Sequence, residues 1–362
     1  MKNESRPRKA TITDVAKAAG VATGTVSRVL NKQADVNEDI RKRVLKAASD
    51  LGYVRLRQRK SPRTNTGKMQ GNIGLICFGM EDTLIQIPIV SRALQGIETA
   101  LSEEGLNLMF ANVPKGDRVP PFLTENRVEG IILKGPNQGR LPSPADSELI
   151  RYLYRFPHIW MMGRLPGAKG DHCNFDTTIA SRLAVTQFRD KGHRRVGFFN
   201  PKPGQSQFER LKFAFHSACY QNGMQYSLLE VNAPEQLGWP LPAITQEDRV
   251  EALLGEWLNL PADTRPTGLL VPSDRTAVQL YRALEKRGLR VGTDISVISC
   301  NNEKSMTGSL DPGLTSIDVR AEAIGRRTVD QLLWRIAHPN EEHDIQVLIE
   351  PTLDAGNSVA SL

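Results

Sequence analysis

Cysteine is scarce in this sequence: the 362 residues include four, at Cys77, Cys173, Cys219 and Cys300. They form no C-x-x-C pair, and each falls in or near an apolar run. Disulfide frameworks and zinc sites need a regular spacing of cysteines, so this scatter argues against both. We expect four buried, reduced thiols in a cytoplasmic protein, with no metal site and no cofactor.

Long hydrophobic runs are also missing. No stretch approaches the roughly 18 apolar residues of a membrane span, and no apolar segment of a secretory signal follows the basic residues 1–10. Hydrophobic residues make up 40% of the chain and charged residues 24%. These proportions are typical of a packed soluble protein, and the length allows two or three domains. We therefore expect no membrane partner.

Catalytic signatures are absent from the sequence as well. It contains no G-x-S-x-G, no H-E-x-x-H and no phosphate-binding G-x-x-x-x-G-K-[ST] motif, and its six histidines form no cluster with cysteine. We expect no catalytic residues and no enzymatic activity.

Positive charge is present but unevenly distributed. Residues 1–63 hold 16 Lys and Arg against 6 Asp and Glu, whereas the remaining residues hold 31 against 34. A basic head on a mildly acidic body favours a nucleic-acid partner, because Lys and Arg displace condensed counterions from phosphates. A solvated basic tail would give the same balance, so charge alone does not decide between them.

The N-terminal region predicts three short helices. Thr13 is expected to cap a first helix that ends at Gly20, where the chain needs a left-handed turn. A second helix is expected over about Thr23–Asn31, and Asn37 is expected to cap a third over residues 38–51.

The spacing around Gly20 indicates a helix-turn-helix. The small Ala16 lies four residues before it and Val26 six residues after it, which lets two helices cross closely at a tight turn. The second helix of such a motif lies in the DNA major groove. The side chains expected to fill the space between the helices are Val15, Ala19, Val21, Val26 and Val29.

The run TITDVAKAAGVATGTVSRVLN, followed by VNEDIRKRVLKAASDLGYV, resembles the DNA-binding head of the lactose-repressor family of bacterial transcription regulators. The resemblance covers about 45 residues and implies that bases are read by Thr23, Gly24 and Arg28. An arginine can bind guanine through two hydrogen bonds, whereas short hydroxyl and amide side chains suit phosphates. Because Gly24 has no side chain, Thr23 and Arg28 are expected to carry most of the direct readout. The full expected DNA-contacting set is Thr13, Thr23, Gly24, Thr25, Ser27, Arg28, Asn31, Asn37, Arg57 and Arg59.

The segment that follows departs from the family pattern. Most relatives carry a P-N-x-x-A-x-x-L hinge helix that wedges a leucine into the minor groove. Residues 55–70 have neither the P-N pair nor a leucine at that spacing, and Pro62 disfavours a helix there. Our hypothesis is that the basic strip containing Arg57 and Arg59 holds phosphates or lies in a minor groove. A leucine wedge by Leu56 in another register and a disordered linker are the alternatives.

After residue 71 short apolar runs alternate with amphipathic helical stretches. About eight such units predict α/β structure with parallel sheets, divided between two similar subdomains. The resemblance to the same family implies a periplasmic-binding-protein-like core. The expected fold is therefore a three-helix helix-turn-helix head on a two-subdomain α/β core. The expected boundaries are a head at 1–54, a hinge at 55–70 and a core at 71–356, with subdomain 1 at about 71–173 and 318–338 and subdomain 2 at about 174–317 and 339–356.

Ligands of open parallel sheets bind beyond the carboxyl ends of the strands, which here means between the subdomains. The resemblance implies an effector there, and a sugar or sugar derivative is the first expectation, although some relatives bind nucleobases or nucleosides. Asn301 stands where an Asp is common, so it accepts and donates hydrogen bonds without supplying charge. The expected effector-contacting residues are Phe78, Arg210, Trp239, Ser273 and Asn301.

These features together predict a sequence-specific transcriptional regulator that represses. We expect a homodimer on a pseudo-palindromic operator, with an effector that changes the angle between subdomains. The residues after Pro351 show no leucine heptads, which argues against a tetramer. The alternative is a sugar- or nucleoside-binding protein without a regulatory DNA function.

Overall fold

The computed structural model describes residues 11–30, 37–51, 71–79, 87–232, 239–240 and 247–362. The chain divides into two compact units, a head within residues 1–65 and a body within residues 66–362.

The head consists of three helices around a small aliphatic core. They are α1 (Ile12–Ala19), α2 (Thr23–Leu30) and α3 (Glu38–Asp50). Val15, Val26 and Val44 are fully buried where the three helices meet. The valine and alanine side chains that the sequence predicts between the helices lie in or against this core, so the helix-turn-helix packing is confirmed.

The first helix begins two residues earlier than expected. Thr11, not Thr13, is its N-cap: the Thr11 hydroxyl accepts from the Asp14 N–H at 3.3 Å, and the Asp14 carboxylate accepts from the Thr11 N–H at 2.8 Å. This reciprocal capping box satisfies two otherwise unpaired N–H groups, and Thr13 lies exposed inside the helix. Gly20 ends the helix with φ 64°, the left-handed conformation that its position predicts.

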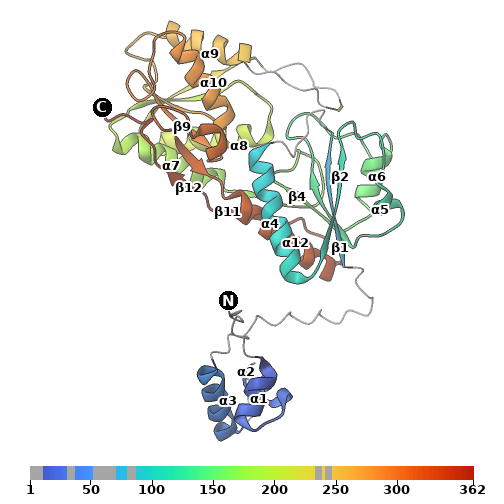
Figure 1. Cartoon of the computed structure of the whole chain (residues 1–362). Helices are drawn as coiled ribbons and strands as arrows, with labels where there is room; N and C mark the ends of the chain where they lie inside the picture. Colours follow the sequence, from blue (N-terminus) through green and yellow to red (C-terminus); the bar gives the residue numbers. More distant parts are fainter. Residues whose placement is uncertain (1–10, 31–36, 52–70, 80–86, 233–238, 241–246) are drawn as a thin grey trace, which may run out of the picture. The chain divides into compact units, whose positions relative to one another are not determined.

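The body has two lobes, each built around a six-stranded sheet (Figure 1). The first sheet has the order β11-β5-β4-β3-β1-β2, with all neighbours parallel. Its strands are β1 (Asn72–Phe78), β2 (Asn107–Val113), β3 (Gly130–Lys134), β4 (His158–Met161), β5 (Asp171–Phe175) and β11 (Gln346–Ile349).

The second sheet has the order β12-β10-β9-β8-β6-β7, and β12 is its antiparallel strand. Its strands are β6 (Arg195–Asn200), β7 (Gln225–Glu230), β8 (Gly268–Leu270), β9 (Ser296–Cys300), β10 (Thr315–Asp318) and β12 (Thr352–Asp354). The two parallel-rich sheets confirm the expected α/β core.

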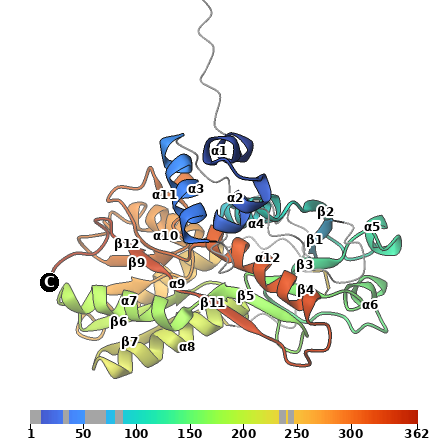
Figure 2. The same cartoon turned by 90° about the horizontal axis from the view of Figure 1, so that it is seen from below.

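Helices cover both faces of each sheet, which explains why the central strands are buried throughout. In the first lobe α4 and α12 cover one face and α5 and α6 the other; in the second lobe α7 and α8 cover one face and α9 and α10 the other. Figure 2 shows α12 lying along β4 and β5. The helices are α4 (Pro88–Glu104), α5 (Pro121–Thr124), α6 (Glu148–Leu153), α7 (Thr177–Asp190), α8 (Ser206–Gln221), α9 (Glu247–Asn259), α10 (Asp274–Glu285), α11 (Lys304–Thr307) and α12 (Ala321–Ala337).

The described chain passes between the lobes after β5, after β10 and after β11. The last passage corrects one expected boundary. Residues 339–356 were expected in the second subdomain, but β11 pairs in parallel with β5 of the first sheet. Only β12, two residues further on, joins the second sheet, so the chain changes lobes at Glu350 and Pro351.

The strand β5 is fully buried although most of its residues are polar. Asp171 at its start accepts hydrogen bonds from Gln331 and Arg335 of α12 and from the Ile345 N–H. Burial alone would raise the pKa of this carboxyl, but the hydrogen bonds hold the pKa below its ordinary value. The ion pair therefore fastens α12 and the start of β11 to the first sheet.

Candidate DNA-binding surface and effector cleft

The second helix of the head presents a polar face to solvent. Val26 and Val29 point into the head core, whereas Thr23, Gly24 and Arg28 are exposed. A methyl group added at Gly24 would meet no atom within 4 Å. The residues expected to read bases are thus exposed together on one short helix, and a helix of this kind fits into the DNA major groove.

The remaining expected DNA contacts have different environments. Thr25 is half-buried at the start of α2, and Thr13 is exposed on α1. Asn37 caps α3 by accepting the Asp39 N–H at 2.8 Å, as its position predicts. The others lie outside what the structure describes: Asn31, Arg57 and Arg59 entirely, and Ser27 in its side chain.

In the body, two of the expected effector contacts, Phe78 and Trp239, pack against each other. Phe78 ends β1 and is 1% exposed, with its ring centroid 5.9 Å from that of Trp160 and 6.1 Å from that of Trp239. Trp239 belongs to the segment between β7 and α9 of the second lobe, yet it packs against the first lobe.

The indole ring of Trp239 packs against two glycines of the first lobe. A Cβ at Gly79 would come within 2.3 Å of the indole ring, and one at Gly116 within 2.6 Å. Both glycines have positive φ angles, 76° and 64°. The absence of side chains at these turns therefore lets a segment of one lobe dock on the other.

The other three expected contacts all lie on the second lobe. Ser273 follows β8 and caps α10, its hydroxyl accepting the Thr276 N–H at 3.3 Å. Asn301 follows the neighbouring β9, and its carbonyl accepts a hydrogen bond from Arg92 of α4 at 3.3 Å. Arg210 is exposed on the second turn of α8. The strand pairing places Ser273 and Asn301 at one edge of the sheet.

Between β3 and α8 the lobes meet through polar residues that we name the cleft polar cluster. Its members are Lys134, Asn137 and Gln138 from the first lobe and Ser206 and Gln207 from the second. The Asn137 carbonyl accepts the Ser206 N–H at 2.6 Å, and the Gln138 amide donates to the Pro203 carbonyl at 2.7 Å.

Several buried atoms of the cleft polar cluster have no hydrogen-bond partner among the described residues. They are Gln138 Oε1, Ser206 Oγ, and both Oε1 and Nε2 of Gln207. Buried polar groups in native proteins are almost always hydrogen-bonded, because an unmade bond costs about 1–3 kcal/mol. Donors and acceptors of this kind, converging between two lobes, are suited to a polar small molecule.

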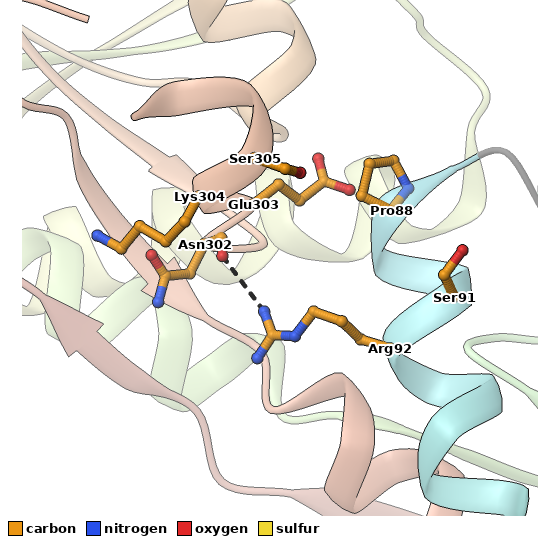
Figure 3. Close-up of a pocket in the computed structure, with 7 residues that line it drawn as sticks. All are labelled: Pro88, Ser91, Arg92, Asn302, Glu303, Lys304 and Ser305. Carbon is orange, nitrogen blue, oxygen red and sulfur yellow. Dashed lines mark hydrogen bonds between the residues drawn. The ribbon is translucent and has the colours of Figure 1, made fainter. Parts of the chain in front are cut away.

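A second region of the lobe boundary surrounds the N-terminus of α4. A cavity of about 650 Å³ lies there, lined by α4 and by the segment after β9 (Figure 3). Arg92 donates to the Asn302 carbonyl at 3.2 Å and pairs with Asp318 at 3.4 Å. The buried Glu303 carboxylate accepts the Ile89 N–H at 2.9 Å. These contacts tie the first turns of α4 to the second lobe.

Two family models match the sequence of this chain. Residues 11–55 match "Bacterial regulatory proteins, lacI family", and residues 185–359 match "Periplasmic binding protein-like domain". The chain carries a lacI-family DNA-binding domain followed by a periplasmic-binding-protein-like domain. It is a DNA-binding transcriptional regulator, and its two-unit fold is the one that the sequence predicts.

The chain is similar to known regulators over nearly its full length. It is 27% identical to the ribose operon repressor of Haemophilus influenzae, over 98% of this chain and 99% of that one. A solved complex of the transcriptional regulator CelR with cellobiose matches with a TM-score of 0.63 at 22% identity, over 98% of this chain and 100% of that one. A lac repressor dimer bound to operator and an anti-inducer matches with a TM-score of 0.61 at 21% identity, with the same coverage. At these identities the structural matches show the fold.

The sequence alone did not single out the cleft polar cluster, Arg92 or Glu303 of the body. One signal was present: Lys134 closes the otherwise apolar β3, where a charged residue is exceptional. The glutamines carry no such signal, because glutamine is common on helix surfaces.

Within the described residues, no group of three or more His, Cys, Asp and Glu is placed to hold a metal ion. No helix of the described residues is long and apolar enough to cross a membrane. All four cysteines are buried and free, as expected.

Gly24→Gln is expected to change operator preference at one base pair of each half-site while the head stays folded. The position is exposed with space around it, and a glutamine amide can bind adenine through two hydrogen bonds. Anisotropy with a set of operators varied at each position measures the preference. Gly24→Ala is the matched control and should leave it unchanged. An unchanged preference in Gly24→Gln would make the glycine a spacer and move selectivity to the basic segment at 55–63.

Proposed function

We propose that this regulator is a homodimeric repressor whose operator affinity is controlled by a small-molecule effector bound between the lobes of its body. The observation that carries the DNA-binding part is the face of α2. Val26 and Val29 of this helix are buried in the head core, whereas Thr23, Gly24 and Arg28 are exposed.

Two heads are needed for a specific operator complex. One α2 helix reads few base pairs, so a dimer on two half-sites multiplies selectivity and matches a pseudo-palindromic sequence. We assign dimerisation to the body, which exposes large hydrophobic side chains at Phe110 of β2, Leu228 of β7 and Leu348 of β11. Basic residues of the head add a salt-dependent attraction to phosphates.

The effector is a sugar or sugar derivative. The ribose operon repressor and the CelR–cellobiose complex are named for such ligands. In this chain, the cleft polar cluster offers unpartnered amide and hydroxyl atoms, which match the paired donor and acceptor character of sugar hydroxyls. Phe78, Trp239, Ser273, Asn301 and Arg210 are proposed to line the same cleft.

Coupling between the cleft and the operator passes through lobe rotation. The contacts of Ile89 and Arg92 with the second lobe hold α4 in one orientation. An effector that binds one lobe angle better than another shifts that equilibrium, and a coupling free energy of about 1–3 kcal/mol is typical. The paired bodies would then change the separation of the two heads.

Fluorescence anisotropy with an operator fragment tests the proposal. We expect sequence-selective binding by a dimer that weakens steeply between about 50 and 200 mM salt, since each neutralised phosphate releases counterions. A scrambled fragment of equal length is the control. The alternative function, binding a sugar or nucleoside without regulating DNA, requires equal affinity for operator and scrambled DNA together with a ligand-dependent rise in Tm.

A further inference from the structure

Lys134 is the most unusual charged group of the lobe boundary. It ends β3, it is 3% exposed, and its ammonium donates to two neutral acceptors, the Gly135 carbonyl at 3.0 Å and the Asn137 side-chain oxygen at 3.2 Å. Within the described residues, no carboxylate forms an ion pair with it. Burying an ammonium without a counter-charge is costly, so proteins rarely leave one in that state.

The surroundings of Lys134 are also positive. The two titratable groups that influence the pKa of Lys134 are Cys77 on the paired strand β1 and Lys202 in the loop after β6. Burial lowers the pKa of Lys134 to about 8, and the like charge of Lys202 acts in the same direction. Burial raises the pKa of the Cys77 thiol to about 11, so it supplies no negative charge at neutral pH.

The nearest part of the second lobe adds to this potential. The helix α8 begins at Ser206, and its N-terminal end carries the positive pole of the helix dipole. The carboxylate in its first turn, Glu209, is paired with Lys212 at 2.7 Å. Arg210 lies one turn further on the same side as Ser206, because residues four apart share a helix face. The buried carboxylates of this lobe, Asp274 and Glu303, are engaged by other groups: Asp274 by Ser316, and Glu303 by the start of α4.

The geometry points to an anionic effector: a carbohydrate that carries a carboxylate or a phosphate, with the negative group at Lys134 and its hydroxyls on the amides of Gln138 and Gln207. This assignment rests on the proposed function and names the effector's charge. The two glutamines approach the cluster from opposite lobes, so one ligand could bond both. Asn137 Oδ1 of the first lobe and Gln207 Oε1 of the second each lie 3.5 Å from a Cβ built at Gly163. Polar atoms of both lobes are therefore close enough for one small ligand to contact them together.

Calorimetric titration of the full-length protein tests the charge directly. The probes are glucose, glucose 6-phosphate and gluconate, with ribose and ribose 5-phosphate as a second set. We expect at least one anionic member to bind about tenfold or more tightly than its neutral parent, the scale of one charge-assisted hydrogen bond. The phosphate and carboxylate members separate the two sources of charge. Equal or tighter binding of the neutral parents, or no anionic binder in either set, overturns the inference.

Lys134→Met isolates the lysine. It removes the ammonium at similar volume, so the preference for the anionic member should disappear while the Tm of the ligand-free protein does not fall. Lys286→Met removes the same charge from an exposed lysine of α10's C-cap and should keep the preference. A clear fall of Tm in ligand-free Lys134→Met would mean that the chain itself neutralises the lysine, and would overturn the inference. Glu81 and Asp82, outside the described residues, are the acidic side chains nearest after β1 in sequence.

The pH dependence gives a second readout. Gluconate stays ionised from pH 7 to 9, whereas Lys134 loses its proton near pH 8. Affinity for gluconate should therefore fall about tenfold over this interval in the wild type and stay flat in Lys134→Met. Operator anisotropy is run alongside. Release of operator by a neutral sugar alone would overturn the anionic assignment and leave the proposed function standing, whereas loss of operator selectivity would defeat the proposed function itself.

Discussion

Arg28→Ala is expected to weaken operator binding by about 10- to 100-fold. Arg28 is exposed in the last turn of α2, on the helix that carries Thr23 and Gly24. An arginine bound to guanine through two hydrogen bonds contributes about 1–3 kcal/mol of discrimination. Because Gly24 supplies no side chain, little on α2 can compensate for the loss. Anisotropy titrations against operator, single-base variants and scrambled DNA measure the effect.

The pattern of the loss identifies the kind of contact. If Arg28 reads a base, the loss appears on operator DNA, preference at one base pair relaxes, and binding to scrambled DNA changes little. Lys46→Ala removes the same charge from an exposed position of α3 and is the control. Equal weakening on operator and scrambled DNA by Arg28→Ala would show a phosphate contact instead. The helical circular dichroism signal should be unchanged in both variants.

Gly96→Ala is expected to destabilise the body by about 1–3 kcal/mol or more, although alanine is the better helix former. Gly96 of α4 faces α12 so closely that an added Cβ would lie 2.0 Å from the Glu322 carbonyl oxygen. Gly325 of α12 mirrors it, with an added Cβ 2.0 Å from the Ala93 carbonyl oxygen. Backbone cannot rotate away as a side chain can, so the two helices would have to separate.

Gly255→Ala is the matched control for this substitution. Gly255 lies inside α9, and a Cβ there meets nothing within 4 Å. This variant should gain roughly 0.5–1 kcal/mol from propensity alone. Urea unfolding followed by the body's tryptophan fluorescence compares the two. Stabilisation by both substitutions would contradict the close helix crossing.

The crossing of α4 and α12 also matters for regulation. The same α4 that needs Gly96 contacts the second lobe through Ile89 and Arg92. Separating the helices should therefore disturb effector response before the body unfolds. In Gly96→Ala we expect a reduced effect of ligand on operator affinity at temperatures where the protein is still folded.

Short apolar runs in the sequence predicted strands such as β1. The run NIGLICF predicts β1, and the structure places it at Asn72–Phe78. The strand β5 was not predicted, because its sequence DHCNF is mostly polar and has neither alternation nor an apolar run. It is a strand because α12, about 160 residues away, supplies Arg335 and Gln331 to its Asp171.

The head and the body differ in how far local sequence decides their function. In the head, Gly20, the flanking valines and the caps lie within 40 residues, so short-range sterics and periodicity determine the helix-turn-helix and the exposed face of α2. Local sequence therefore accounts for the DNA-binding head, and the alternation of apolar runs with amphipathic stretches accounts for the α/β body.

The space between the lobes is lined by residues that are far apart in the sequence. Gln207 is an ordinary residue in its own segment, and the sequence of β3 does not show what Lys134 contacts; the two become part of a buried polar cluster because chain crossovers bring β3 and α8 together. Trp239 likewise packs against the first lobe only because Gly79 and Gly116 have no side chains that would occupy the same space. The physical reason is that the cost of burying a polar or charged group depends on its partners, and those partners come from distant parts of the chain.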